Sequence, residues 1–191
     1  MIRFIKNILD IKNILGMARA LAPYPANELI IRSNGQGDLE FIPVYTGTLT
    51  IVQGANTNYY PDTLSGTGFI IPANEGDSIT ITGNITGLDM HGFDSDLLAV
   101  NDSLVDLKIA ERLYIVDLRN ADQIQNFTYD ADEVDTLYAI ADNAAQKDVC
   151  VAIITNSSVS NGTLWIDGAQ AYAADVIAAA QAKGWRICYV R

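Results

Sequence analysis

Residues 83–139 decide the fold because they carry a short internal repeat: GNITGLDMHGFDSDLLAVNDSLVDLKIAERLYIVDLRNADQIQNFTYDADEVDTLYA. The unit is apolar-x-x-apolar-x-apolar, and it occurs six times, with Ser95 in the first position of the second copy. The middle positions are Leu88, Leu98, Leu107, Val116, Phe127 and Leu137, which are separated by 10, 9, 9, 11 and 10 residues. A β-solenoid keeps such a step because each half-coil returns the chain to the same height. Two half-coils would make a turn of about 20 residues.

The residues after the repeat have a mixed pattern. We expect helices over 133–147 and 173–183, the second ended by Gly184, and strands over 149–156, 162–168 and 185–191. The last coil of a repeat array would otherwise expose its apolar face to water. We therefore expect this tail to form an α/β cap.

The residues before the repeat, 27–82, are expected to form a small β domain. Short runs rich in β-branched residues alternate with clusters of Gly, Asn and Asp, and no helical pattern interrupts them. Residues 56–68, NTNYYPDTLSGTG, form the longest polar piece and are expected to be a loop, either a contact loop or a plain connector.

Residues 2–22 are expected to form a helix within an N-terminal region, 1–26. Phe4, Ile8, Ile11 and Leu15 recur at the spacing of a helix–helix seam, and Pro23 follows the helix. The helix either packs on its own domain or serves as an anchor or oligomerisation device; a membrane-surface helix is the remaining alternative. Ile at two of the four seam positions favours more than two strands, so we expect a homotrimer.

The composition indicates which classes of partner the protein can bind and where in the cell it is found. Lys and Arg number 12 against 23 Asp and Glu, for a formal net charge of −11, which argues against nucleic acid or an anionic membrane as main partner. No stretch is apolar enough for a membrane span or a secretory signal, so we expect the protein to be made in the cytoplasm and either to stay cell-associated until lysis or to use an unusual exit. Cys150 and Cys188 lie in apolar runs, either as buried free thiols or as a disulfide between adjacent strands.

Residues 75–191 resemble the leucine-rich-repeat proteins of gut anaerobes and of the phages that infect them. The stretch GDSITITGNITGLDM (76–90) is similar to the family pattern GxxTITGxITxLD, and SLVDLKIAE and RLYIVDLRN are similar to its half-repeats. The most specific match is the tail, GTLWIDGAQ followed by VIAAAQAKGWRICYV. The usual Asn and Cys ladder positions are mostly missing. The resemblance implies a leucine-rich-repeat-like fold used for surface display and binding, and it carries no catalytic residues.

Residues that often carry chemistry have simpler interpretations here. His91 is the single histidine and is expected at a surface corner, and no nucleotide-binding or GxSxG motif occurs. Two acidic clusters, Asp89, Asp94 and Asp96 and residues 130–135, could offer oxygen ligands to Ca²⁺ at solenoid corners, but the DxDxxD spacing of the second cluster fits no EF-hand loop. In the second cluster, 130–135, Asp132 or Glu133 is expected to cap the following helix. We therefore expect no catalytic residues, cofactor or metal site, and the protein is not expected to be an enzyme.

Tyrosine is enriched, with nine residues, and aromatic rings anchor interfaces and stack on sugars. Half-buried strand positions would also explain the enrichment. If a binding site exists, Tyr59, Tyr60 and Trp165 are its candidate residues. The partner would be a host-surface glycan or protein.

Two functions are compatible with these observations. The first is a structural phage virion protein, a head fibre or capsid decoration, which is assembled in the host cytoplasm beside other virion or capsid proteins. The second is a leucine-rich-repeat adhesin or a carbohydrate- or protein-binding module at the bacterial cell surface. The second requires an export signal, which the N-terminal residues do not show.

Overall fold

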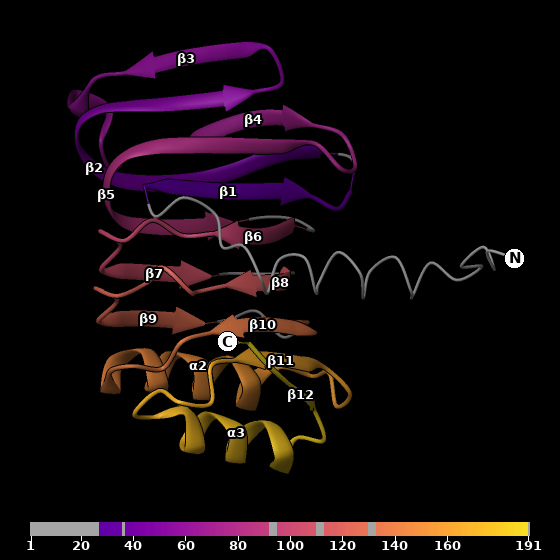
Figure 1. Cartoon of the computed structure of the whole chain (residues 1–191). Helices are drawn as coiled ribbons and strands as arrows, with labels where there is room; N and C mark the ends of the chain where they lie inside the picture. Colours follow the sequence, from indigo (N-terminus) through magenta and orange to yellow (C-terminus); the bar gives the residue numbers. More distant parts are fainter. Residues whose placement is uncertain (1–26, 36, 92–94, 110–112, 130–132, 191) are drawn as a thin grey trace, which may run out of the picture.

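The computed structural model describes residues 27–35, 37–91, 95–109, 113–129 and 133–190. This part of the chain is mainly β, with two α-helices and a large mixed sheet of twelve strands (Figure 1). The expected N-terminal helix, with Phe4, Ile8, Ile11 and Leu15, lies outside the described residues. The sheet order is β12-β11-β10-β8-β6-β1-β5-β2-β3, with β4 paired to β2, and β7 and β9 extending from β5.

The first part of the sheet is antiparallel. It consists of β1 (Glu28–Ser33), β2 (Gly37–Gln53), β3 (Asn56–Tyr60), β4 (Phe69–Ala73) and β5 (Ser78–His91), with the short 3-10 helix η1 (Asp62–Leu64) between β3 and β4. Residues 56–60, expected in a loop, instead form β3, because Asn56–Tyr60 pair with the end of β2. Gly83 lies opposite an irregularity in β2, where a Cβ would come within 3.2 Å of the Thr48 carbonyl oxygen.

Two parallel ladders follow from this antiparallel part. One continues β5 through β7 (Asp106–Ile109) to β9 (Asn126–Tyr129). The other runs through β6 (Ser95–Ala99), β8 (Leu113–Asp117), β10 (Thr136–Ala139), β11 (Thr163–Ile166) and β12 (Arg186–Tyr189). Figure 1 shows β6 to β10 stacked between the antiparallel strands at one end and the two helices at the other, with β11 and β12 beside the helices.

The two regions expected to meet between residues 82 and 83 share their strands and their core. The expected boundary falls inside β5, which pairs with β1, β2 and β7. One cluster of buried apolar side chains extends from Leu29 to Trp185. The strands of 27–82 and those of the repeat therefore pack on a continuous core.

The middle positions of the repeat face this core, with one correction. Leu88, Leu107, Val116 and Leu137 are at most 3% exposed. In the second copy Leu97, not the expected Leu98, pairs with Val116 and is fully buried in the main core. The pairing shifts between Ser95 and Leu97, and this irregularity moves the side chain of Leu98 into a separate small cluster.

Both elements expected over 133–156 were misplaced, and of the helix expected over 133–147 only residues 144–147 are helical. Residues 136–139 form β10, and the run VCVAIITN lies in helix α2 (Ala144–Asn156). Asn143 begins the helix by accepting a hydrogen bond at its side chain from the backbone N–H of Gln146. The buried side chains of α2 fall at helical spacing, namely Gln146, Val149, Cys150, Ile153 and Ile154.

The rest of the tail agrees with expectation. Strand β11 lies within 162–168, and β12 lies within 185–191. Helix α3 (Ala173–Ala182) is followed by Gly184, whose φ of +81° is the left-handed conformation that often ends helices. None of the helices in the described ranges has the length and hydropathy that a membrane crossing requires.

Candidate functional site: a polar groove at the start of three parallel strands

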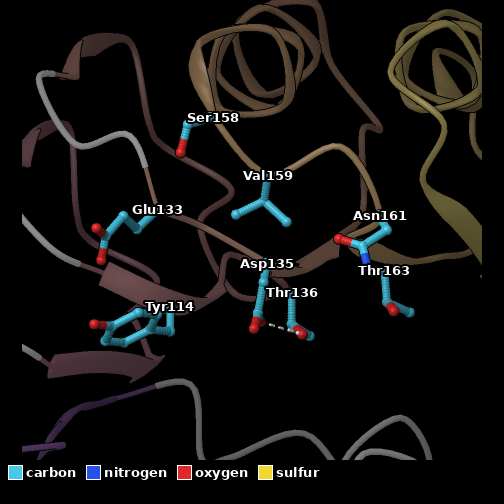
Figure 2. Close-up of a pocket in the computed structure, with 8 residues that line it drawn as sticks. All are labelled: Tyr114, Glu133, Asp135, Thr136, Ser158, Val159, Asn161 and Thr163. Carbon is cyan, nitrogen blue, oxygen red and sulfur yellow. Dashed lines mark hydrogen bonds between the residues drawn. The ribbon is translucent and has the colours of Figure 1, made fainter.

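A polar groove lies where strands β8, β10 and β11 begin (Figure 2). It is an open cavity of about 430 Å³. Its lining comes from three separate chain segments and consists of Tyr114, Glu133, Asp135, Thr136, Ser158, Val159, Asn161 and Thr163. Seven of these eight side chains carry a hydroxyl, carboxylate or amide group, so the groove is built to form hydrogen bonds.

Backbone hydrogen bonds of the parallel ladder fix the floor of the groove. The Asp135 N–H donates to the Tyr114 carbonyl at 2.9 Å, and the Thr163 N–H donates to the Asp135 carbonyl at 2.7 Å. These bonds extend the ladder by one residue before β10 and hold the three chain segments in register. The Thr136 hydroxyl donates to the Asp135 carboxylate at 2.8 Å, which orients that carboxylate (Figure 2).

One wall of the groove is the loop of residues 157–162, which follows α2. The Ser157 hydroxyl is buried and donates to the Val134 carbonyl at 2.7 Å. The Trp185 indole N–H donates to the Val159 carbonyl at 2.7 Å. Gly162 packs directly against Trp185, since a Cβ there would lie 2.6 Å from the Trp185 ring and 2.8 Å from the Asp135 carbonyl oxygen. The loop is thus held at both ends by buried groups.

An aromatic stack lies on the same face of the sheet, next to the groove. Side chains two residues apart on a strand point to the same face, so Tyr138 follows Thr136 and Trp165 follows Thr163. The Tyr138 and Trp165 rings stack with centroids 5.9 Å apart at an interplanar angle of 10°. The Arg119 guanidinium lies over the Tyr138 ring, 4.9 Å from its centroid.

The structure does not bring the three sequence-predicted binding residues together. Tyr59 and Tyr60 lie on β3 and Trp165 on β11, near opposite ends of the sheet (Figure 1). Tyr59 is 71% exposed, whereas Tyr60 packs edge-on against Phe69 with centroids 4.8 Å apart. Only Trp165 is adjacent to the groove.

The groove residues themselves were not predicted as a site. Glu133 was expected to cap a helix, but the helix begins at Ala144 and is capped by Asn143, and Glu133 and Asp135 instead precede strand β10. A usable signal was present, because polar residues recur directly before or at the start of the parallel strands, as in Asp135–Thr136 and Thr163.

The other acidic cluster forms ion pairs in its described members. Asp96 is 1% exposed, and its carboxylate accepts hydrogen bonds from the Arg32 guanidinium, the Asn34 side-chain amide and the Ile115 backbone N–H. Asp89 pairs with Lys108 at 3.0 Å. Asp94 lies outside the described residues, and His91 ends β5. Within the described ranges, no three His, Cys, Asp or Glu side chains are grouped so that they would hold a metal ion.

Both cysteines are free thiols in the structure, and they differ in environment. Cys150 is buried in α2, not in the expected strand, and burial raises the pKa of its thiol to about 12. Cys188 lies on the edge strand β12 and is half-buried.

Thiol labelling is expected to distinguish the two cysteines. The thiolate is the reactive form, so at pH 8 a thiol reagent should modify Cys188 in the native protein and Cys150 only after denaturation. The measurement is the number of thiols that react rapidly with a chromogenic disulfide, and the Cys188→Ser variant should react with none. Rapid reaction of that variant would contradict the buried position of Cys150.

Comparison with protein-family models, with curated proteins and with solved structures gives no match for this chain.

Proposed function

We propose that the chain is a structural protein of a phage virion, a head fibre or capsid decoration, in which a short solenoid displays a binding or shielding surface. The observation that carries the proposal is the register of the two parallel ladders. Leu88, Leu107 and Phe127 are partners in one ladder, 19 and 20 residues apart. Leu97, Val116 and Leu137 are partners in the other, 19 and 21 residues apart.

A nearly constant separation of about 20 residues between paired positions supports the solenoid interpretation, because each turn of the chain then stacks on the previous one. In space, helices α2 and α3 lie beyond β9, the last strand of the β5-β7-β9 ladder (Figure 1). Strands β11 and β12 extend the other ladder. This placement supports the role of residues 140–190 as an α/β cap. The proposed solenoid would project from its attachment point as a rigid body and needs no catalytic step.

The choice of a virion rests on the resemblance to phage and gut-anaerobe repeat proteins and on the charge. A formal net charge of −11 favours solubility at the high local concentration of a particle surface. In this proposal the N-terminal segment attaches the protein to other virion or capsid proteins and joins three copies.

The location is tested by immunogold electron microscopy of lysates from producing cells, with antibody raised against the full chain. Gold on assembled capsids is the expected result. Gold confined to the cell envelope, with particles unlabelled, would overturn the virion proposal and support the second candidate, a bacterial surface adhesin or carbohydrate- or protein-binding module. The polar groove of Figure 2 is the observation that favours this candidate.

The trimer is tested with charged substitutions in the N-terminal seam. Light scattering coupled to size exclusion should give three chains for the full protein and one for the double variant Ile8→Asp, Ile11→Asp, since a buried carboxylate at a seam position is unfavourable. Lys6→Asp, which lies off the seam, serves as the control and should remain trimeric. A monomeric full chain would contradict the trimer.

A further inference from the structure

We propose that the groove formed by residues 114, 133–136 and 158–163 binds a short saccharide through its hydroxyl groups. The inference rests on the proposed display function, because it assigns a ligand class to the displayed surface. None of the residues expected to bind, Tyr59, Tyr60 and Trp165, lines this groove.

The polar groups of the groove favour a ligand that both donates and accepts hydrogen bonds. The Glu133 and Asp135 carboxylates accept, while the Asn161 amide both donates and accepts. A sugar hydroxyl donates to a carboxylate and accepts from an amide at the same time. An anionic ligand would be repelled by the two carboxylates, and an ammonium ion would leave the donor groups unused.

The groove is also arranged before any ligand arrives. Trp185 holds the loop at Val159, the Ser157 hydroxyl holds its beginning, and the Thr136 hydroxyl orients Asp135. Binding to a preorganised site does not require ordering of a loop, which would otherwise weaken the affinity for a small polar ligand. This matters because hydrogen bonds exchanged with water contribute little net affinity each.

The neighbouring aromatic stack supplies an apolar surface for a second sugar ring. Trp165 is half-buried, and its ring orientation is fixed by Tyr138. It lies on the same face of the sheet as Thr163, which lines the groove. An oligosaccharide of two or more units would therefore place one ring among the polar groups and the next against Trp165.

The test is an array of neutral and acidic oligosaccharides, probed with the labelled full chain and followed by titration calorimetry of the best binder. We expect binding to at least one neutral oligosaccharide. The double variant Glu133→Gln, Asn161→Ala should bind about tenfold more weakly or worse, because it loses a charged acceptor and a donor. The matched control Glu75→Gln, Asn58→Ala changes the same residue types at exposed positions outside the groove and should bind as the original protein does.

Three results would overturn the inference. These are the absence of binding to any saccharide, binding that the groove variant leaves unchanged, and a preference for acidic saccharides. Circular dichroism of the groove variant must match the original protein, and the exposed or half-exposed positions changed make this the expected result. Gold labelling of capsids without saccharide binding would refute the ligand class and leave the display function standing. Saccharide binding without capsid labelling would refute the virion proposal and leave the ligand class standing.

Discussion

The variant Asp117→Asn is expected to lower the free energy of unfolding by about 3–5 kcal/mol, the usual cost of breaking a buried ion pair by removing one partner. Asp117 is 3% exposed and Arg119 is 7% exposed. Two side-chain bonds join them, from Arg119 Nε at 3.0 Å and from Arg119 Nη2 at 2.6 Å. Asparagine keeps the shape but not the charge, so the guanidinium would stay buried beside a neutral group.

Urea denaturation followed by circular dichroism measures this loss. The double variant Asp117→Leu, Arg119→Met removes the guanidinium together with the carboxylate that it bonds, and it should be considerably more stable than Asp117→Asn. The variant Asp148→Asn is the exposed control. The side chain of Asp148 is 73% exposed and pairs with Lys147 at 2.9 Å, so its loss should change stability by about 1 kcal/mol or less. Equal effects of Asp117→Asn and Asp148→Asn would refute the buried pair.

The repeated strands of residues 83–139 could be predicted because their apolar spacing follows from the need to fill one core. Side chains that fill one core must recur at the spacing of the paired parallel strands, and Leu88, Leu107, Val116 and Leu137 do so. The prediction failed at Leu98, where two adjacent leucines satisfy the pattern equally well. The irregular pairing after Ser95 decides between them, and the sequence pattern contains no information about it.

The region of α2 was mispredicted because composition and spacing disagree there. Residues 149–155 are rich in β-branched side chains, which favour strands. The buried positions nevertheless recur at helical spacing, and Asn143 provides a cap. Tertiary packing against the core outweighs the local preference of β-branched residues, which is small for each residue.

The groove could not be predicted because its residues meet only through the register of the sheet. Tyr114, Asp135 and Asn161 are far apart in the sequence and come together through the pairing of β8, β10 and β11. Tyrosine enrichment was a poor guide, since exposure differs between individual residues. Tyr138 is 2% exposed and Tyr59 is 71% exposed, although both lie in strands.

The variant Trp185→Ala is expected to lower the free energy of unfolding by about 3–5 kcal/mol, because it removes a large buried side chain and leaves a cavity. Trp185 is 4% exposed, belongs to the main core and contacts Gly162 closely enough that no Cβ fits between them. Trp165→Ala is the matched control. Its ring is only half-buried, so the loss should be clearly smaller, and equal losses for the two variants would contradict the packing of Trp185 in the core.

The same tryptophan allows the stability of the core to be separated from the arrangement of the groove. In Trp185→Phe most of the apolar contact remains, but the hydrogen bond to the Val159 carbonyl is lost. A lost hydrogen bond of this kind lowers stability by about 1–3 kcal/mol, so the variant should still fold. Because Val159 lines the groove, the saccharide affinity of fully folded Trp185→Phe should be lower than that of the original protein. The control is Ile79→Val, which loses a similar amount of stability far from the groove, and its saccharide affinity should stay unchanged. Unchanged affinity in Trp185→Phe would mean that the loop is positioned by its other contacts, Ser157 and Gly162.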